Sequence, residues 1–234
     1  MKMNKIALAC GAVMLSMSGL SVADDEFSMN IGVTSNYIWR GVTQTDDGAA
    51  VSGGVDYAHG SGFYVGAWAS NVDWSTVDGA GATTPSPVSY ELDLYGGYAG
   101  EIGDFGYDAG LIYYTYDDSA DSNFLELGLS GSWKFLTAGL NYTLSGQADD
   151  DTGLYVNGDM YYYAGVSFDL PQDFSIGGTV GKYDFTNSSD DDYTHYQIDV
   201  SKTAGDYGDV SLSLADTDMD GSDIKFFVSW SKSF

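Results

Sequence analysis

Apolar and small polar residues alternate with a period of two through most of this chain, and that alternation is the feature that most constrains its fold. Successive side chains of a β-strand point to opposite faces, so each alternating segment has one apolar and one polar face. Twelve such segments follow one another, at 27–34, 51–57, 63–71, 88–94, 105–116, 125–130, 136–144, 162–168, 174–180, 196–201, 210–214 and 224–234. In the third segment, Tyr64 and Trp68 lie on the face opposite Val65 and Ala67, so both faces are apolar and the sequence does not decide which one points to the lumen. An even number of strands is typical of a closed antiparallel barrel.

The last segment carries an additional signal. In the sequence KFFVSWSKSF, apolar Phe226, Val228 and Trp230 share one face, the serines share the other, and the chain stops on Phe234. Closing strands of bacterial outer-membrane barrels end on an aromatic residue that lies in the interfacial girdle. Lys232 interrupts the apolar face. We therefore expect a transmembrane strand that the barrel-assembly machinery recognises through its end at Phe234.

The connections between segments fall into two classes that alternate along the chain. Tight turns follow the even-numbered segments, at His59–Gly62, Gly100–Asp104, Ser132–Phe135, Pro171–Asp173 and Ala204–Tyr207. Longer polar stretches follow the odd-numbered ones, at Gly41–Gly48, Asp73–Pro87, Asp117–Asp121, Gly146–Asn157, Asp184–Asp192 and Thr217–Ser222. Short periplasmic turns and longer outer loops are the outer-membrane arrangement, with both termini periplasmic. A soluble β-sandwich or an exported adhesin would also alternate, but neither requires two loop classes or an aromatic closing strand.

The N-terminus predicts export. A basic start at Met1–Lys5 precedes an apolar run at Ile6–Leu20 and small residues that end at Ala23. This is the pattern of a secretory signal peptide, and the apolar run is short for a membrane span. We expect a signal peptide over residues 1–23 and a barrel over residues 24–234. The single cysteine, Cys10, lies in the signal, so the mature chain has no disulfide.

The charge balance excludes one class of partner. The chain has 34 acidic and 8 basic residues and a net charge of −26, and removal of the signal takes Lys2 and Lys5 but no acid, which leaves −28. Nucleic acid is not an expected partner, because phosphate contacts need Lys and Arg. With 31 Gly, 19 Tyr and 3 Pro, the composition suits neither a helical nor a disordered chain.

Charged residues on the inward face are the candidates for selectivity. The set comprises Arg40, Asp56, Glu91, Asp93, Asp108, Glu126 and Asp199. Rings of Asp and Glu lower the energy of cations in a pore and raise that of anions. Arg40 is the only arginine, and the parity of the first segment, extended to it, points it inward. It serves either as a gating or selectivity contact or as a structural ion pair that fixes the first loop. We expect carboxylates to pair with it.

A possible metal site lies in the last long loop. Asp216, Asp218, Asp220 and Asp223 copy the first positions of a calcium loop, but Phe227 stands where the bidentate Glu is required and no helices flank the motif. A polar hairpin loop explains these residues equally well. No other cofactor is expected. An enzyme is not expected either, because a lipid-acting hydrolase needs a His beside a nucleophile, and only His59 in a turn and lumen-facing His195 are available.

Two segments carry a family resemblance. Residues 35–45 (SNYIWRGVTQT) and 62–72 (GFYVGAWASNV) resemble the two signature segments of a proteobacterial family known as Gcw_chp, also described as the TorF family of porins. The resemblance runs along essentially the whole mature chain. It implies an outer-membrane location and a pore, and no established substrate. The matching positions are Tyr37, Arg40, Gly41, Gln44, Gly66, Trp68, Ser70 and Asn71.

Together these features predict an all-β, up-and-down transmembrane barrel of twelve strands in the outer membrane, in contact with its lipids and lipopolysaccharide. We expect a porin-like channel for passive diffusion of small cationic or neutral solutes through a narrow acidic lumen. Two alternatives stay open. One is a non-conducting surface barrel whose acidic loops bind divalent cations or a partner, and the other is a transporter for one particular solute.

Overall fold

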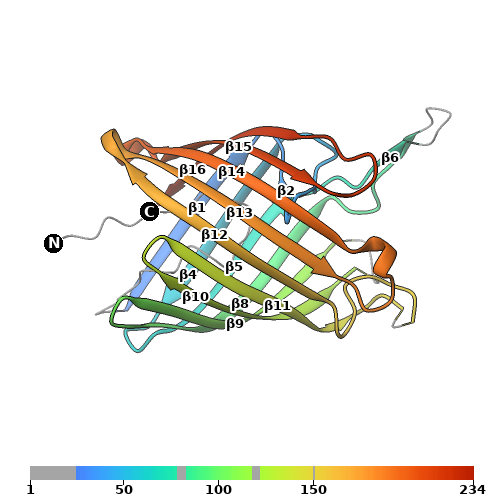
Figure 1. The fold of residues 1–234 in the computed structure, drawn as a ribbon, viewed down its shortest axis with the longest axis horizontal. Coiled ribbons are helices and arrows are strands. Elements are labelled where there is room, and N and C mark those ends of the chain that lie inside the picture. The colour runs from blue at the N-terminus through green and yellow to red at the C-terminus, as the bar shows by residue number, and fades with distance from the viewer. Residues whose placement is uncertain (1–24, 78–82, 118–121, 150) are drawn as a thin grey trace.

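The fold is a single closed barrel of antiparallel strands (Figure 1). The computed structural model describes residues 25–77, 83–117, 122–149 and 151–234, so the predicted signal peptide lies outside the described residues. Within these ranges, the barrel strands are β1 (Glu26–Thr34), β4 (Ala50–Ala58), β5 (Phe63–Asn71), β8 (Tyr90–Ile102), β9 (Phe105–Tyr116), β10 (Phe124–Trp133), β11 (Leu136–Gly146), β12 (Met160–Leu170), β13 (Phe174–Asp184), β14 (Tyr193–Thr203), β15 (Asp209–Thr217) and β16 (Lys225–Ser233). The predicted twelve-stranded up-and-down topology is confirmed.

The first strand closes the barrel. β1 pairs with β4 on one side and with β16 on the other, with Val33 opposite Trp230. Beyond β16, the backbone N–H of Phe234 donates to the carbonyl of Met29 at 2.9 Å, and the reverse bond is 3.2 Å. Each barrel strand therefore has a hydrogen-bonded neighbour on both sides, so the barrel sheet, as the structure describes it, has no edge strand.

The outer surface of the wall is apolar, because the residues of one parity in each strand point away from the lumen. Phe27 and Phe226 are 64% and 62% exposed on this surface. In β5, Phe63 and Val65 are also exposed, whereas Tyr64 is buried on the lumen side. The sequence alternation did not determine which face of β5 points outward; the structure places the face with Phe63 and Val65 on the outer surface. Large exposed hydrophobic side chains recur on all of the barrel strands that surround the lumen.

The two ends of the barrel differ (Figure 1). One end, the short-turn end, carries the tight connections and the 3-10 turns η1 (Pro171–Asp173) and η3 (Gly205–Tyr207). The other, the long-loop end, carries β6 (Thr76–Val77), β7 (Thr83–Thr84) and η2 (Ser189–Asp191). The C-terminal end of the chain, after β16, lies on the short-turn side. Among the residues that the structure describes, no helix has the length and apolar character needed to cross a membrane.

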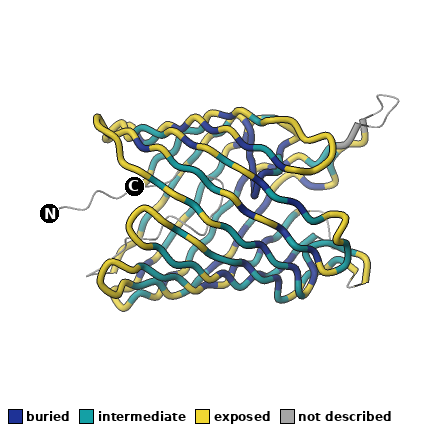
Figure 2. Tube along the Cα trace, viewed as in Figure 1, coloured by how far each residue is buried: buried dark blue, intermediate teal, exposed yellow. Residues whose placement is uncertain are grey.

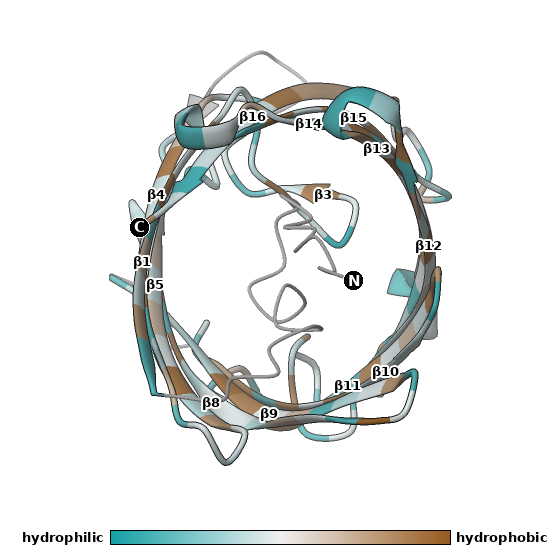
Figure 3. Ribbon diagram, turned by 90° about the vertical axis from the view of Figure 1, so that its left-hand side faces the viewer, coloured by the Kyte–Doolittle hydropathy of each residue, from teal (hydrophilic) through white to brown (hydrophobic). Residues whose placement is uncertain are grey.

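The first long loop folds into the barrel. It contains two short paired strands, β2 (Ile38–Trp39) and β3 (Val42–Thr43), and Figure 3 shows β3 inside the ring of barrel strands. The sequence analysis pointed Arg40 inward by extending the parity of segment 27–34; the structure places Arg40 inward too, but on this loop and not on a continuation of β1. β1 ends at Thr34, whose hydroxyl donates to the carbonyl of Asn36 at 2.8 Å and turns the chain inward. Buried residues consequently gather toward the long-loop end (Figure 2).

Candidate functional site

The candidate site is the contact between the lumen wall and the hairpin formed by residues 38–43, which we call the lumen hairpin. Its turn residues are Arg40 and Gly41, with φ of 48° and 88°. Positive φ at both central positions is the signature of the tight two-residue hairpin whose twist matches its strands. Ile38 faces Thr43 and Trp39 faces Val42 in the register, so Arg40 stands at the tip.

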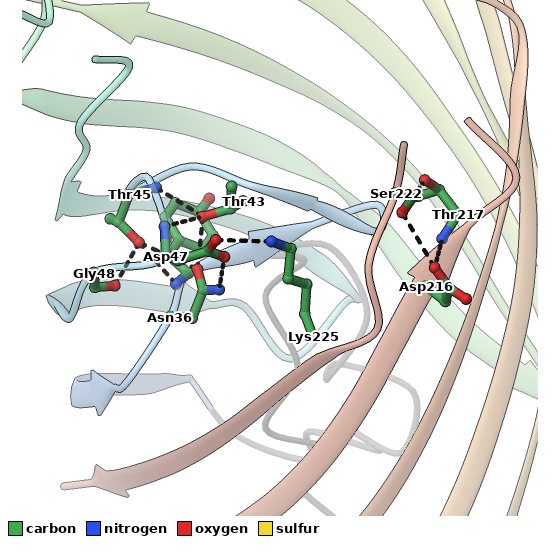
Figure 4. A network of polar contacts seen from close by, with 10 residues as sticks. Asn36, Thr43, Thr45, Asp47, Gly48, Asp216, Thr217, Ser222 and Lys225 are labelled. Carbon is green, nitrogen blue, oxygen red and sulfur yellow. Dashed lines mark hydrogen bonds and ion pairs between the residues drawn. The ribbon is translucent and has the colours of Figure 1, made fainter. Parts of the chain in front are cut away.

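A polar network fixes the base of the lumen hairpin (Figure 4). The side chain of Asn36 accepts a hydrogen bond from Thr43 at 2.7 Å and donates one to Asp47 at 2.8 Å. Lys225, at the start of β16, pairs with the other oxygen of Asp47 at 2.7 Å. The bond from Lys225, with that from Asn36, lowers the pKa of Asp47 below its ordinary value of 3.8. The hairpin base is thereby tied to the barrel wall.

Arg40 is bound on the far side of the lumen by Glu126 of β10. Its two terminal nitrogens donate to the two carboxylate oxygens at 2.8 and 2.6 Å, and one of them also donates to the hydroxyl of Tyr183 at 3.0 Å. The side chains of Arg40 and Glu126 are 5% and 1% exposed. A bidentate pair of this kind gives both geometric specificity and a strong charge-assisted interaction.

Aromatic rings enclose this ion pair. The guanidinium carbon of Arg40 lies 4.2 Å from the ring centre of Trp39, 4.3 Å from that of Tyr161 and 5.3 Å from that of Tyr183. Cation–π attraction strengthens when the cation is desolvated. Further rings pack around these from the wall and the neighbouring loops: Tyr114, Phe124, Tyr155, Phe185 and Tyr193. The lumen hairpin therefore packs into a dense aromatic cluster rather than lying loosely in the lumen.

The hairpin tip also fits closely against β14 and β15. A Cβ atom added to Gly41 would lie 2.5 Å from the Cβ of His195 and 2.8 Å from the methyl group of Thr217. The ring of His195 faces the lumen, as its parity predicted, and its Nε2 lies 2.6 Å from the hydroxyl of Tyr161. Position 41 thus requires glycine for two reasons: its backbone is left-handed, and the wall lies too close for a larger side chain.

Two of the predicted lumen carboxylates lie beside the lumen hairpin on β8. Glu91 is 2% exposed and accepts a hydrogen bond from the hydroxyl of Tyr37 at 3.1 Å. Asp93 is fully buried, and neither of its oxygens has a hydrogen-bond donor. The structure therefore brings these two carboxylates together with Arg40 and Glu126 in one buried region.

The other three predicted carboxylates lie apart from this region. Asp56 of β4 accepts hydrogen bonds from Tyr95 at 2.5 Å and from Asn30 at 3.4 Å. Asp108 of β9 accepts one from Tyr64 at 3.1 Å. Asp199 of β14 accepts bonds from Ser213 at 2.6 Å and Gln197 at 2.9 Å. Within the described ranges, none of the three forms an ion pair with a basic side chain.

The predicted calcium loop is not assembled as a ligand set. Asp216 accepts hydrogen bonds from the backbone of Thr217 at 2.9 Å and the hydroxyl of Ser222 at 3.1 Å (Figure 4), and Asp218 accepts one from the backbone of Thr194 at 2.7 Å. Across the part of the chain that the structure describes, no three His, Cys, Asp or Glu side chains are grouped to hold a metal ion. Asp220 and Asp223 thus have no place in such a group.

Sequence reasoning missed the lumen hairpin and the aromatic cluster around it. The dipeptide Arg40–Gly41 between Ile38–Trp39 and Val42–Thr43 is the signal that could have found the hairpin, because a glycine in a two-residue connection between apolar residues favours a tight turn. No comparable local signal identifies Tyr161 or Tyr183, since their contacts with Arg40 join residues far apart in the chain.

Solved structures support the fold. The chain resembles the "KdgM porin" with a TM-score of 0.57 and 12% identity, over 88% of this chain and 99% of that one. It resembles that porin "in complex with disordered oligogalacturonate" with a TM-score of 0.56 and 11% identity, over 88% and 99%. It also resembles the "COG4313 outer membrane channel from Pseudomonas putida F1", with a TM-score of 0.53 and 11% identity, over 90% and 96%. At these identities the likeness establishes the fold alone.

A family model described as "Bacterial protein of unknown function (Gcw_chp)" matches residues 21–231. No curated protein sequence matches the chain significantly. The match covers the barrel except for the last residues of β16 and includes both segments on which the resemblance to this family rested.

Proposed function

The chain belongs to the bacterial family Gcw_chp, and we propose that it is an outer-membrane, porin-like channel through which small cationic or neutral solutes diffuse. A closed wall with an apolar outside and a polar inside suits a bilayer, because each barrel strand is hydrogen-bonded to a neighbouring strand on both sides. The likeness to a porin and to an outer-membrane channel supports the same location and the kind of pore that the TorF resemblance implies.

The observation that carries the cation preference is the imbalance of charge on the lumen face. The predicted set has six carboxylates and one arginine, and that arginine is fully engaged by Glu126. Asp56, Asp108 and Asp199 are left without a basic partner in the described chain. Unneutralised carboxylates lower the energy of a cation in a confined space and raise that of an anion.

The same charge distribution argues against a polyanionic solute. One similar structure is a porin in complex with oligogalacturonate, which is a chain of sugar acids. A lumen lined by carboxylates would repel such a chain over a distance of about 8 to 10 Å at moderate ionic strength. We therefore assign this protein cationic or neutral solutes and not an anionic polymer.

One observation favours the alternative of a non-conducting barrel. The lumen hairpin and its aromatic cluster bury Arg40, Glu126 and Tyr183 almost completely at the long-loop end. If this packing persists in the membrane, the barrel passes little current, and the acidic loops become the functional surface. Conductance therefore separates the two functions.

The test is the reversal potential of purified protein in a planar bilayer under a potassium chloride gradient. We expect current with a preference for potassium, which weakens as salt concentration rises. The variant Asp56→Asn, Asp108→Asn should lower that preference, because it removes two lumen charges and keeps the side-chain shapes. The control is Asp191→Asn, which removes one exposed loop charge in η2 and should leave the preference unchanged. Absence of current refutes the channel, and anion preference refutes the assigned solute class.

A further inference from the structure

Glu91 and Asp93 stand on adjacent inward positions of β8, and their neighbours are defined by the sheet register. Glu91 lies opposite Ser70 of β5 and Tyr116 of β9, and Asp93 lies opposite Trp68 and Tyr114 on the same two strands. Directly opposed side chains on one face of a sheet are in contact range. Tyr37, the residue that precedes the lumen hairpin, lies beside the pair, and its ring centre is 5.6 Å from that of Trp68.

Asp93 lacks every partner that a buried carboxylate requires. Its exposed fraction is 0%, no hydroxyl, amide or basic group of the described chain donates a hydrogen bond to either oxygen, and the group that contacts it is the carboxyl of Glu91. When both are ionised, the two carboxylates are only acceptors, so neither satisfies the other. A buried charge without a counter-charge or hydrogen bond is strongly unfavourable. The geometry therefore leaves a positive charge missing between them.

Arg40 does not supply that charge. Both of its terminal nitrogens are bound to the two oxygens of Glu126. The buried region beneath the lumen hairpin thus contains three carboxylates and one guanidinium, which leaves two negative charges. In the described part of the chain, the ion pairs of the other basic residues are made with Asp25, Asp47 and Asp184, all outside this region.

We propose that Glu91 and Asp93 form a binding site for one divalent cation of the calcium class, enclosed by the lumen hairpin. Carboxylate and hydroxyl oxygens are hard ligands, which such cations prefer, and a single divalent ion balances the two remaining charges. The hydroxyl of Tyr37 is the third oxygen, at 3.1 Å from Glu91. The site depends on two carboxylates and one phenolic hydroxyl.

The site would join the lumen hairpin to the wall. Tyr37 precedes the hairpin, whereas Glu91 and Asp93 belong to β8, so a cation held between them connects the two. Binding of a ligand to the folded arrangement alone stabilises it. The hairpin should therefore be more protected from proteolysis when the cation is bound. The site rests on the fold and does not require that the barrel conducts.

Terbium luminescence tests this proposal on the full-length mature protein folded in detergent. Terbium ions replace calcium at oxygen sites, and energy transfer from nearby Trp and Tyr rings, here Trp68 and Tyr37, makes bound terbium emit. We expect an emission that calcium displaces. Asp93→Asn should weaken the calcium-displaceable affinity by at least about tenfold, because it removes a ligand and one charge. Tyr37→Phe, which keeps the ring, should weaken it less.

The controls separate this site from other acidic surfaces. Asp218→Asn removes a carboxylate of the last long loop, and Asp199→Asn removes a lumen carboxylate on β14; both should leave the emission unchanged. The heat-dependent gel mobility of each variant shows whether its barrel has formed. Emission that persists in Asp93→Asn, or that is lost in Asp218→Asn instead, overturns the proposal. So does an infrared carboxylic-acid band that calcium does not remove, since a shared proton would then occupy the place of the cation.

Conductance distinguishes this proposal from the proposed function. If the barrel carries no current but terbium binds as described, the channel is refuted and the cation site stands. If the barrel conducts but Asp93→Asn binds terbium like the unmodified protein, the site is refuted and the channel stands.

Discussion

The guanidinium of Arg40 and the carboxylate of Glu126 face each other in parallel, with hydrogen bonds of 2.8 and 2.6 Å, although 86 positions separate them in the chain. The pair holds the tip of the lumen hairpin against β10. Because both side chains are almost completely buried, the removal of one of them leaves the other as a buried charge without a counter-ion, which strongly destabilises the folded protein. The sequence analysis left Arg40 as either a functional contact or a structural ion pair. Its geometry makes it the attachment point of the first loop.

Glu126→Gln should release the lumen hairpin. The substitution keeps the size of the side chain but leaves Arg40 buried without a counter-ion, which costs roughly 3 to 5 kcal/mol. We expect faster proteolysis of the loop between β1 and β4 and a larger single-channel conductance. The matched control is the double variant Arg40→Met, Glu126→Leu, which removes both charges and should be less destabilised than Glu126→Gln. Equal loop protection in Glu126→Gln and the unmodified protein would show that the pair does not hold the hairpin.

Gly41→Ala should disrupt the packing of the hairpin tip against the wall. The added methyl group would lie 2.5 Å from the Cβ of His195, in a backbone with φ of 88°. The control is Gly221→Ala, where φ is 80° but no atom lies within 4 Å of the added group. Both variants carry the backbone strain of a left-handed residue, about 1 kcal/mol or more. A lower midpoint of thermal unfolding for Gly41→Ala than for Gly221→Ala would measure the contact with His195, and equal midpoints would exclude it.

Acid should loosen the base of the lumen hairpin through Asp47. The bond from Lys225, aided by that from Asn36, lowers the pKa of this carboxyl below 3.8 in the folded protein. A lowered pKa stabilises the folded loop above pH 3.8, and this contribution is lost as the pH falls through the lowered value. Hydrogen exchange of residues 44–49 should therefore rise in that acidic range. In Asp47→Asn the exchange near neutral pH should already be raised, with a weaker dependence on acid; an unchanged acid profile would contradict this role.

A charge on the outer face of β14 should be far more harmful than one on its inner face. Ile198 lies at the middle of the strand and is 55% exposed on the outside, whereas its neighbour Gln197 points inward beside Asp199. Arginine facing lipid at the bilayer midplane costs about 2 to 4 kcal/mol. Ile198→Arg should thus fold poorly into lipid vesicles, while Gln197→Arg, with a carboxylate within reach, should fold nearly normally. Equal folding of the two variants would argue against a lipid-facing outer wall.

The twelve strands could be predicted from the sequence because their signal is local. Each strand needs one apolar and one polar face, and alternation displays this within about ten residues. The same alternation predicted inward positions for Glu91, Asp93 and Glu126, where the structure also places them. It pointed Arg40 inward, as the structure does, but on a wrong assumption: counting parity beyond Thr34 supposes that the strand continues, whereas Arg40 enters the lumen on the lumen hairpin. Alternation contains no information on where a strand ends if the following residues are also apolar and small polar.

The amino-acid sequence by itself determined the alternating wall, the two classes of connection and the excess of carboxylates over basic residues, since these follow from residue types a few positions apart. Only the tertiary structure decided that the first long loop enters the lumen, that Arg40 meets Glu126, and that Asp93 is left without a donor. The physical reason is that barrel closure brings distant strands around one enclosed space. Which loop fills that space depends on the shapes and charges of the whole ring of strands and not on any one segment.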